Sequence, residues 1–131
     1  MYRKIITAAR ETRRWAMKNR KSFPRPLNGM CAIASHRLSE SLSKENIKHD
    51  IVVTDGHVWV ETSYWAIDVT ATQFHKHFSD PVVVMRKPEY RKIIGKVVDL
   101  PARRFSCRDK MEKFLWDMGW DSSQIPRKRS R

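Results

Sequence analysis

Three side chains that together perform thiol chemistry follow one another in the chain as Cys31, His57 and Asp68. A cysteine nucleophile works with a histidine that moves its proton and with an acceptor that fixes the tautomer of the imidazole ring. The sequence supplies these roles in the order thiol, imidazole, carboxylate. Whether they act together depends on the chain elements that carry them.

His57 and Asp68 fall on two neighbouring segments, residues 57–61 and 64–69, that alternate side chains of two kinds. Such alternation is typical of β-strands with two unlike faces. A two-residue turn at residues 62–63 would place His57 directly opposite Asp68. Opposed residues of an antiparallel pair share a face, with Cβ atoms roughly 5 Å apart. We therefore expect the imidazole to lie beside the carboxylate.

A third strand is predicted just before this pair. Residues 49–54 are rich in β-branched apolar side chains, and Asp55-Gly56 after them is a favoured two-residue hairpin turn. The result is a three-stranded antiparallel meander over 49–54, 57–61 and 64–69. Residues 69–74 are expected to end the last strand and to run into a loop or a short helical turn.

Cys31 is expected on a helix. Asn28 is a good N-cap, and apolar residues recur at helical spacing from Gly29 to about Ser43. Cys31 would then lie in the first turn, where unpaired N–H groups and the helix dipole favour a thiolate. The alternative is a buried structural cysteine, since this residue also behaves as a small hydrophobe. Cys107 has no histidine near it in the sequence and is interpreted as structural or incidental.

Further elements flank this central region. Apolar residues at three- and four-residue steps predict a basic amphipathic helix over residues 2–21. Ser106 as N-cap, Asp109 as capping-box acid and Gly119 as terminator predict a helix over 106–119. Short strands are expected at 81–85 and 96–100, and a basic disordered tail at 127–131.

The chain carries a formal net charge of +13, concentrated at its two ends. Residues 1–21 hold eight Lys or Arg against one acid, residues 22–100 hold ten against nine, and residues 101–131 hold nine against four. Basic ends attract polyanions, so a nucleic acid, an anionic membrane surface or an acidic protein is a possible partner. The residues that would contact nucleic acid are Arg3, Arg10, Arg13, Arg14, Lys18, Arg127, Lys128 and Arg129.

The length of 131 residues favours a single domain, over residues 1–126. No apolar run approaches the roughly 18 residues needed to span a bilayer, and no secretory signal is recognised. Two cysteines without such a signal predict reduced thiols and a cytoplasmic location. His75, His77 and Asp80 resemble a metal site, but exposed loop histidines are the better interpretation, and no metal or cofactor is expected.

The motifs around the three candidate residues resemble those of the transglutaminase-like superfamily of papain-fold thiol enzymes. The matching segments are Gly29–Ser35 (GMCAIAS), Gly56–Glu61 (GHVWVE) and Trp65–Thr70 (WAIDVT). They lie within residues 27–74, a little over a third of the chain. In that family the cysteine heads a helix packed on an antiparallel sheet, and the histidine and aspartate lie on adjacent strands.

The resemblance implies an α+β, papain-like or transglutaminase-like core in an enzyme that attacks amide bonds as a peptidase, deamidase, amidase or transamidase. Carried over, Cys31 is the nucleophile, His57 the general base and acid, and Asp68 the orienting acid. Trp59 and Glu61 match positions expected to support the site. The substrate would be a peptide or protein amide, and no cofactor is implied.

The chain departs from the family pattern at the oxyanion position. No glutamine lies just upstream of Cys31 to act as a donor. The backbone N–H of Cys31 is the expected first donor, and Asn28 is a candidate for the second. Two alternatives to the enzyme stay open: a basic nucleic-acid-binding protein, and a family member that binds a peptide without turning it over.

Overall fold

The computed structural model describes residues 1–19, 26–54, 57–74, 77–98 and 102–106, together with Lys110 and Lys113. It is α+β, as predicted. In chain order the elements are α1 (Tyr2–Asn19), α2 (Pro26–Lys44), β1 (Asp50–Val53), β2 (Val58–Glu61), β3 (Trp65–Asp68), the 3₁₀ helix η2 (Ala71–Phe74), β4 (Val83–Arg86), α3 (Lys87–Ile94) and β5 (Arg103–Phe105).

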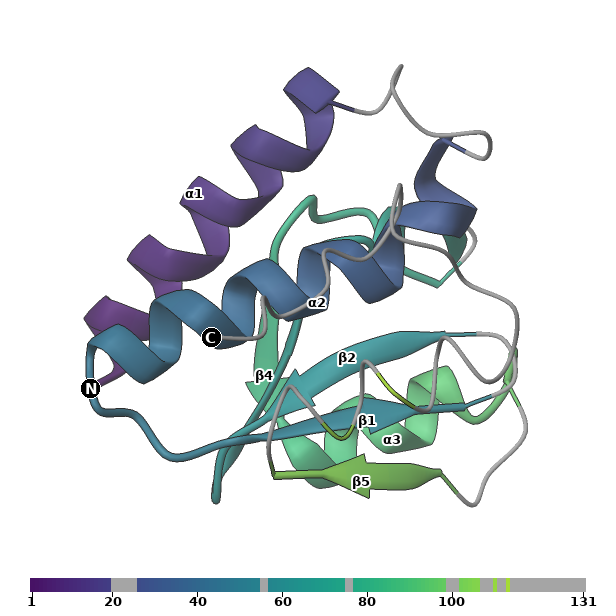
Figure 1. Ribbon diagram of the computed structural model, residues 1–131. Helices are drawn as coiled ribbons and strands as arrows, with labels where there is room; N and C mark the ends of the chain where they lie inside the picture. Colours follow the sequence, from purple (N-terminus) through teal and green to yellow (C-terminus); the bar gives the residue numbers. More distant parts are fainter. Residues whose placement is uncertain are drawn as a thin grey trace.

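The five strands form one antiparallel sheet in the order β4-β3-β2-β1-β5. The predicted meander is confirmed, because β1 pairs with β2 and β2 pairs with β3. Figure 1 shows α1 and α2 together over one face of the sheet and α3 over the other. The sheet is therefore the middle of three layers.

Side-chain alternation divides the strands between two buried clusters. Val58 and Val60 pack with apolar residues of α1 and α2. Trp59, which lies between them in the sequence, packs on the opposite side with Tyr90 and Ile94 of α3. Because both faces are covered, polar side chains on the α3 side of the sheet are buried as well, and each needs a partner.

The predicted N-terminal helix is confirmed over its described part. One residue of α1 departs from its expected surface role: Arg13 is partly buried and donates from Nη1 to the Val69 carbonyl (2.9 Å) and to the Thr72 hydroxyl (3.0 Å). This contact ties α1 to the segment that follows β3. The buried face of α1 consists of Ile5, Ala8, Ala9, Thr12 and Ala16.

A Schellman motif ends α2 and turns the chain toward β1. Asn46 adopts a left-handed conformation with φ of 58°. Its N–H donates to the Ser43 carbonyl (3.0 Å), and the Ile47 N–H donates to the Leu42 carbonyl (2.9 Å). These two bonds define the motif, and an apolar contact commonly accompanies them. Leu42 and Ile47 are both buried in the core cluster beside α2.

The turn between β2 and β3 lies one residue later than predicted. The Thr62 N–H donates to the Trp65 carbonyl (2.8 Å), which leaves Ser63 and Tyr64 as the turn. The Thr62 hydroxyl accepts hydrogen bonds from the N–H groups of Tyr64 (3.2 Å) and Trp65 (2.9 Å). Threonine thus precedes the turn because its hydroxyl satisfies the turn's N–H groups.

An unpredicted helix, α3, follows β4 directly. Pro88 lies in its first turn, where proline is favoured, and the Gly95 N–H caps its end by donating to the Arg91 carbonyl (3.0 Å). The strand predicted over 96–100 is wrong for its described part, because residues 96–98 form a turn and a bend after this helix. Val97 and Val98 follow the end of α3 and are not part of the sheet.

The remaining predictions have mixed outcomes. The strand predicted at 81–85 is present as β4, and the short helical turn is present as η2. The edge strand β5 was not predicted. Of the helix predicted over 106–119, Ser106, Lys110 and Lys113 are described, and the two lysines are helical. The rest of that segment and the tail at 127–131 lie outside the described residues.

Candidate active site

His57 and Asp68 approach each other diagonally and not as the opposed pair that was predicted. In the observed register Glu61 opposes Ala66, which differs from the predicted alignment by two residues. A shift of two keeps every side chain on its predicted face, because side chains of a strand alternate with a period of two. The expected contact is therefore present, with Nε2 of His57 2.5 Å from Oδ2 of Asp68.

The backbone of His57 is fixed by Thr54, across the predicted Asp55-Gly56 turn, which itself lies outside the described residues. The Thr54 N–H donates to the His57 carbonyl (2.8 Å). The Thr54 hydroxyl donates to the same carbonyl (3.0 Å) and accepts from the His57 N–H (2.9 Å). Both residues are buried. These bonds fix the backbone that carries the imidazole, just before β2.

The Asp68 carboxylate is fully hydrogen-bonded, although only 1% of the residue is exposed. Oδ2 accepts from His57 and from the Tyr90 hydroxyl (2.6 Å), and Oδ1 accepts from the N–H (2.9 Å) and the hydroxyl (3.4 Å) of Thr70. Burial alone would raise the pKa of Asp68, but the charge of His57 and these hydrogen bonds lower it below its usual value. The carboxylate is an anion in the folded protein.

Cys31 reaches the imidazole from α2. The residue is 4% exposed, and its side chain lies close enough to the imidazole to help raise the pKa of His57. Asp68 holds Nε2 of the same ring. The structure thus brings together the three residues that the sequence singled out.

The start of α2 corrects two predictions about Cys31. The helix begins at Pro26, a residue favoured at the first helical position, and not after an Asn28 cap. Cys31 therefore lies beyond the first four residues, whose N–H groups have no partner within the helix. Its N–H belongs to the helical ladder, so it is neither at the charged helix end nor a free oxyanion donor. The Asn28 side chain lies outside the described part of the chain.

The groups around His57 favour its protonated form. Burial disfavours a charged ring, but the Asp68 carboxylate and the Cys31 sulfur outweigh it and hold the pKa of His57 well above its usual value near 6.5. The ring is therefore an imidazolium at neutral pH. A cation beside a thiol favours the thiolate, which is the nucleophilic form. The predicted activation by the helix end does not apply, because Cys31 lies beyond the first turn of α2.

Trp59 packs beside His57 on the α3 side of the sheet. Its ring lies 6.0 Å from the imidazole and 5.2 Å from the ring of Tyr90, centroid to centroid. Its Nε1–H donates to Oε2 of Glu61 (3.0 Å). Trp59 therefore separates the imidazole from a second buried carboxylate, and its own orientation is fixed by that carboxylate.

Glu61 is the centre of a second charged cluster. Its side chain is 0% exposed, and it accepts hydrogen bonds from Nε and Nη2 of Arg91 (3.1 and 2.6 Å) and from Nη1 of Arg104 (2.7 Å). Burial would raise the pKa of Glu61, but hydrogen bonds from Arg91, Trp59 and Arg104 lower it below its usual value. The two predicted supporting residues thus contact each other, and Trp59 also packs against His57.

Sequence reasoning missed the residues that α3 and β5 contribute to these clusters. Tyr90 and Arg91 lie on α3, and Arg104 lies on β5. The sequence does contain a sign that a helix starts here. Pro88 is followed by Glu89, and an acid in the first turn suits the helix dipole. Nothing in the sequence shows which strand such a helix covers.

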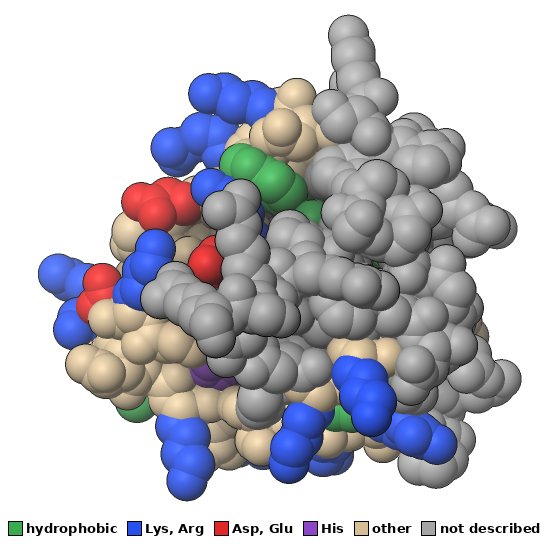
Figure 2. Space-filling model, viewed as in Figure 1, with side chains coloured by type: hydrophobic (Ala, Val, Ile, Leu, Met, Phe, Trp, Pro, Cys, Tyr) green, Lys and Arg blue, Asp and Glu red, His purple; other side chains and the backbone are tan. Residues whose placement is uncertain are grey.

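The described residues among those expected to contact nucleic acid all lie on α1. Arg3, Arg10, Arg14 and Lys18 are exposed on α1. Figure 2 shows Lys and Arg side chains at the top, left and bottom of the described part of this face, with acidic side chains among those on the left. His77 and Asp80 are also exposed. Arg127, Lys128, Arg129, His75 and Cys107 lie outside the described residues.

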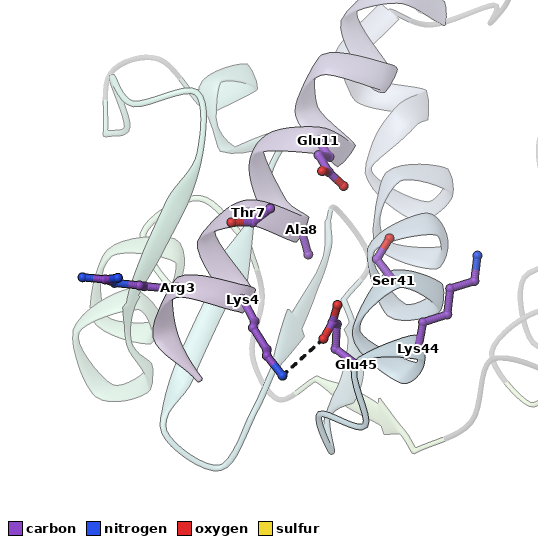
Figure 3. A pocket seen from close by; sticks show the side chains of 8 residues that line it. All are labelled: Arg3, Lys4, Thr7, Ala8, Glu11, Ser41, Lys44 and Glu45. Carbon is purple, nitrogen blue, oxygen red and sulfur yellow. Dashed lines mark ion pairs between the residues drawn. The ribbon is translucent and has the colours of Figure 1, made fainter.

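A cleft of about 420 Å³ lies between α1 and α2. Lys4 and Glu45 form an ion pair there (3.4 Å) with both side chains about half exposed. Figure 3 shows Arg3 and Lys44 pointing away from this pair. Ser41 in its wall is ten residues, roughly 15 Å, along α2 from Cys31. The cleft is thus a charged surface groove that is separate from the thiol.

Comparison of the chain with protein-family models, with curated proteins and with solved structures gives no match. Within the described ranges, no helix is both long enough and apolar enough to cross a membrane. No group of three or more His, Cys, Asp or Glu side chains in those ranges is arranged to hold a metal ion. A function is therefore inferred from the geometry of Cys31, His57 and Asp68.

Proposed function

We propose that this chain is a transglutaminase-like thiol enzyme, with a papain-like core, that attacks an amide bond through Cys31, His57 and Asp68. The observation that supports this most is the contact between three side chains from three separate parts of the chain in the order thiol, imidazole, carboxylate. A buried histidine is already stabilised by its aspartate. The Cys31 thiol beside the imidazole adds the nucleophile that covalent catalysis requires.

The first half of the reaction forms a thioester. The Cys31 thiolate bonds to the carbonyl carbon of the amide, and the carbonyl electrons move to oxygen. The His57 imidazolium then gives its proton to the amide nitrogen, the carbon–nitrogen bond breaks and the amine leaves. The enzyme now holds an acyl group on Cys31 and a neutral His57.

The second half releases the acyl group. Water or an amine loses a proton to His57 as it attacks the thioester, the carbon–sulfur bond breaks, and the thiolate and imidazolium are restored. Water makes the enzyme a peptidase, amidase or deamidase, and an amine makes it a transamidase. Asp68 stays ionised throughout, because its role is to orient the ring and to stabilise its charge.

Turnover of a mixed amide library tests this proposal. The library contains glutamine peptides, other short peptides and small primary amides, and hydroxylamine serves as an amine acceptor. Wild-type protein is expected to release ammonia or an amine, or to form a hydroxamate, from at least one class. Because Cys31 is only 4% exposed, slender acyl groups such as glutamine side chains should react first.

Two cysteine variants give the comparison. Cys31→Ala is expected to abolish product formation, whereas Cys107→Ala should retain it. Equal turnover by Cys31→Ala and wild-type protein would contradict the proposal. Wild-type protein that binds a peptide without acyl-enzyme or product formation would instead be the peptide-binding relative that is not a catalyst.

A further inference from the structure

Tyr90 shares one carboxylate oxygen with the candidate catalytic histidine. Its hydroxyl lies 2.6 Å from Oδ2 of Asp68, the oxygen that also lies 2.5 Å from Nε2 of His57. Tyr90 is 0% exposed, and His57 and Asp68 are each 1% exposed. Two donors therefore divide the charge of one buried oxygen between them.

The hydroxyl is a permanent donor. An ionised carboxylate can only accept hydrogen bonds, so Tyr90 donates. Burial and the neighbouring charge of Asp68 raise the pKa of Tyr90 well above its usual value, which keeps its proton in place. The ring is held between Trp59 (5.2 Å) and Phe78 (5.7 Å), centroid to centroid. The hydroxyl reaches Asp68 from α3, an element that the three proposed catalytic residues do not occupy.

We infer that Tyr90 is a positioning residue that acts through Asp68 to set the pH range in which Cys31 and His57 form a thiolate–imidazolium pair. This rests on the proposed function of those residues. A donated hydrogen bond withdraws part of the carboxylate charge from the ring. Without it, Asp68 is more basic and binds the His57 proton more strongly.

The other charged groups near this unit are fixed by partners of their own. Cys31 faces His57 from α2, and Glu61 faces Tyr90 from β2. Glu61 is neutralised by Arg91 and Arg104. Removal of the Tyr90 hydroxyl therefore changes one hydrogen bond to Asp68 and leaves these ionic contacts in place.

The experiment measures the rate at which iodoacetamide alkylates Cys31 from pH 4 to pH 11, followed by peptide-resolved mass spectrometry on the full chain. In wild-type protein the rate should rise once as the ion pair forms and a second time as His57 loses its proton. Tyr90→Phe should move the second step, the loss of the His57 proton, to higher pH by about one unit, the size expected for losing a hydrogen bond to a carboxylate. Phe78→Leu disturbs the packing of the same ring but keeps the hydroxyl, and should leave both steps in place.

A fluorotyrosine-labelled protein tests the same inference with the hydroxyl present. The chain has three tyrosines, and Tyr2 and Tyr64 are about half exposed. Incorporation of 3-fluorotyrosine into a Tyr2→Phe/Tyr64→Phe protein therefore places fluorine at residue 90 alone. A fluorinated phenol is a stronger donor, so the second step should move to lower pH. This opposite shift keeps the inference testable if Tyr90→Phe does not fold.

These outcomes distinguish failure of the proposed function from failure of the role inferred for Tyr90. A wild-type profile with the single step of an ordinary thiol near pH 8.5 would contradict the proposed function itself. A two-step profile that neither Tyr90→Phe nor fluorotyrosine moves would overturn the role of Tyr90 and leave the proposed function intact. A shift of equal size in Phe78→Leu would assign the effect to packing and would also overturn it.

Discussion

Asp68→Asn is expected to lower amide turnover by about 10⁴-fold, as loss of the orienting aspartate does in a serine triad. The buried imidazole keeps its unfavourable environment but loses its anion, so the pKa of His57 should fall below its usual value near 6.5. The ring would then be neutral at pH 7. Alkylation of Cys31 at pH 7 should fall by about thirtyfold, because an ordinary thiol is only a few per cent ionised there.

The matched control is Asp50→Asn. Asp50 pairs with Arg104 at 3.2 Å, and both side chains are more than one third exposed, so its loss should leave the alkylation rate unchanged. The unfolding midpoint of each sample shows whether the protein is folded at the temperature of the assay. A folded Asp68→Asn protein that retains the wild-type rate would show that the carboxylate does not act on the thiol through His57.

Glu61→Ala is expected to give the largest loss of stability, with the free energy of unfolding lower by about 3–5 kcal/mol, typical of breaking a buried ion pair from one side. The change removes the acceptor for Arg91, Arg104 and the Trp59 indole together. Each of these donors would then be left without its buried partner. Urea unfolding monitored by tryptophan fluorescence measures the loss.

Two other glutamate variants sharpen this test. Glu45→Ala breaks an exposed ion pair with Lys4 and should cost less than about 1 kcal/mol. Glu61→Gln keeps the shape and one acceptor oxygen, so its stability should fall between those of wild-type protein and Glu61→Ala. A Glu61→Ala protein within 1 kcal/mol of the wild type would show that the cluster contributes little net stability.

The part of the site that depends on local patterns was predictable. Alternation in the two strands placed His57 and Asp68 on one face, and this prediction was insensitive to the error in the turn because a shift of two residues preserves the face. The position of the turn itself was decided by the Thr62 hydroxyl, a side-chain effect that alternation does not report.

The start of α2 shows two local signals in competition. Asn28-Gly29 favours a helix cap, but Pro26 is equally suited to the first helical position, and the longer helix forms. The choice moved Cys31 away from the helix end. In the proposed enzyme the thiol is therefore activated by contact with His57 and not by the helix end, the local feature that the sequence suggested.

Tertiary contacts account for most of what the sequence did not reveal. Tyr90 is on an eight-residue helix, too short for a strong periodic signal, and its role depends on the strand that it covers. Arg104 lies on a three-residue edge strand whose two arginines are exposed and do not alternate visibly. Arg13 looks like a surface cation in the sequence, yet its guanidinium binds a carbonyl 56 residues away.

The most direct test of the account is the ratio of Cys31 alkylation rates at pH 8.5 and pH 6.5, because access to the buried sulfur cancels in this ratio. A thiol that ionises in the ordinary range reacts about fiftyfold faster at pH 8.5. Wild-type protein should show a ratio below about three, since the imidazolium of His57 keeps the sulfur ionised at both pH values, and His57→Ala should restore the ratio of about fifty. A wild-type ratio near fifty would mean that sulfur, imidazole and carboxylate lie together without acting as a unit, which contradicts the account.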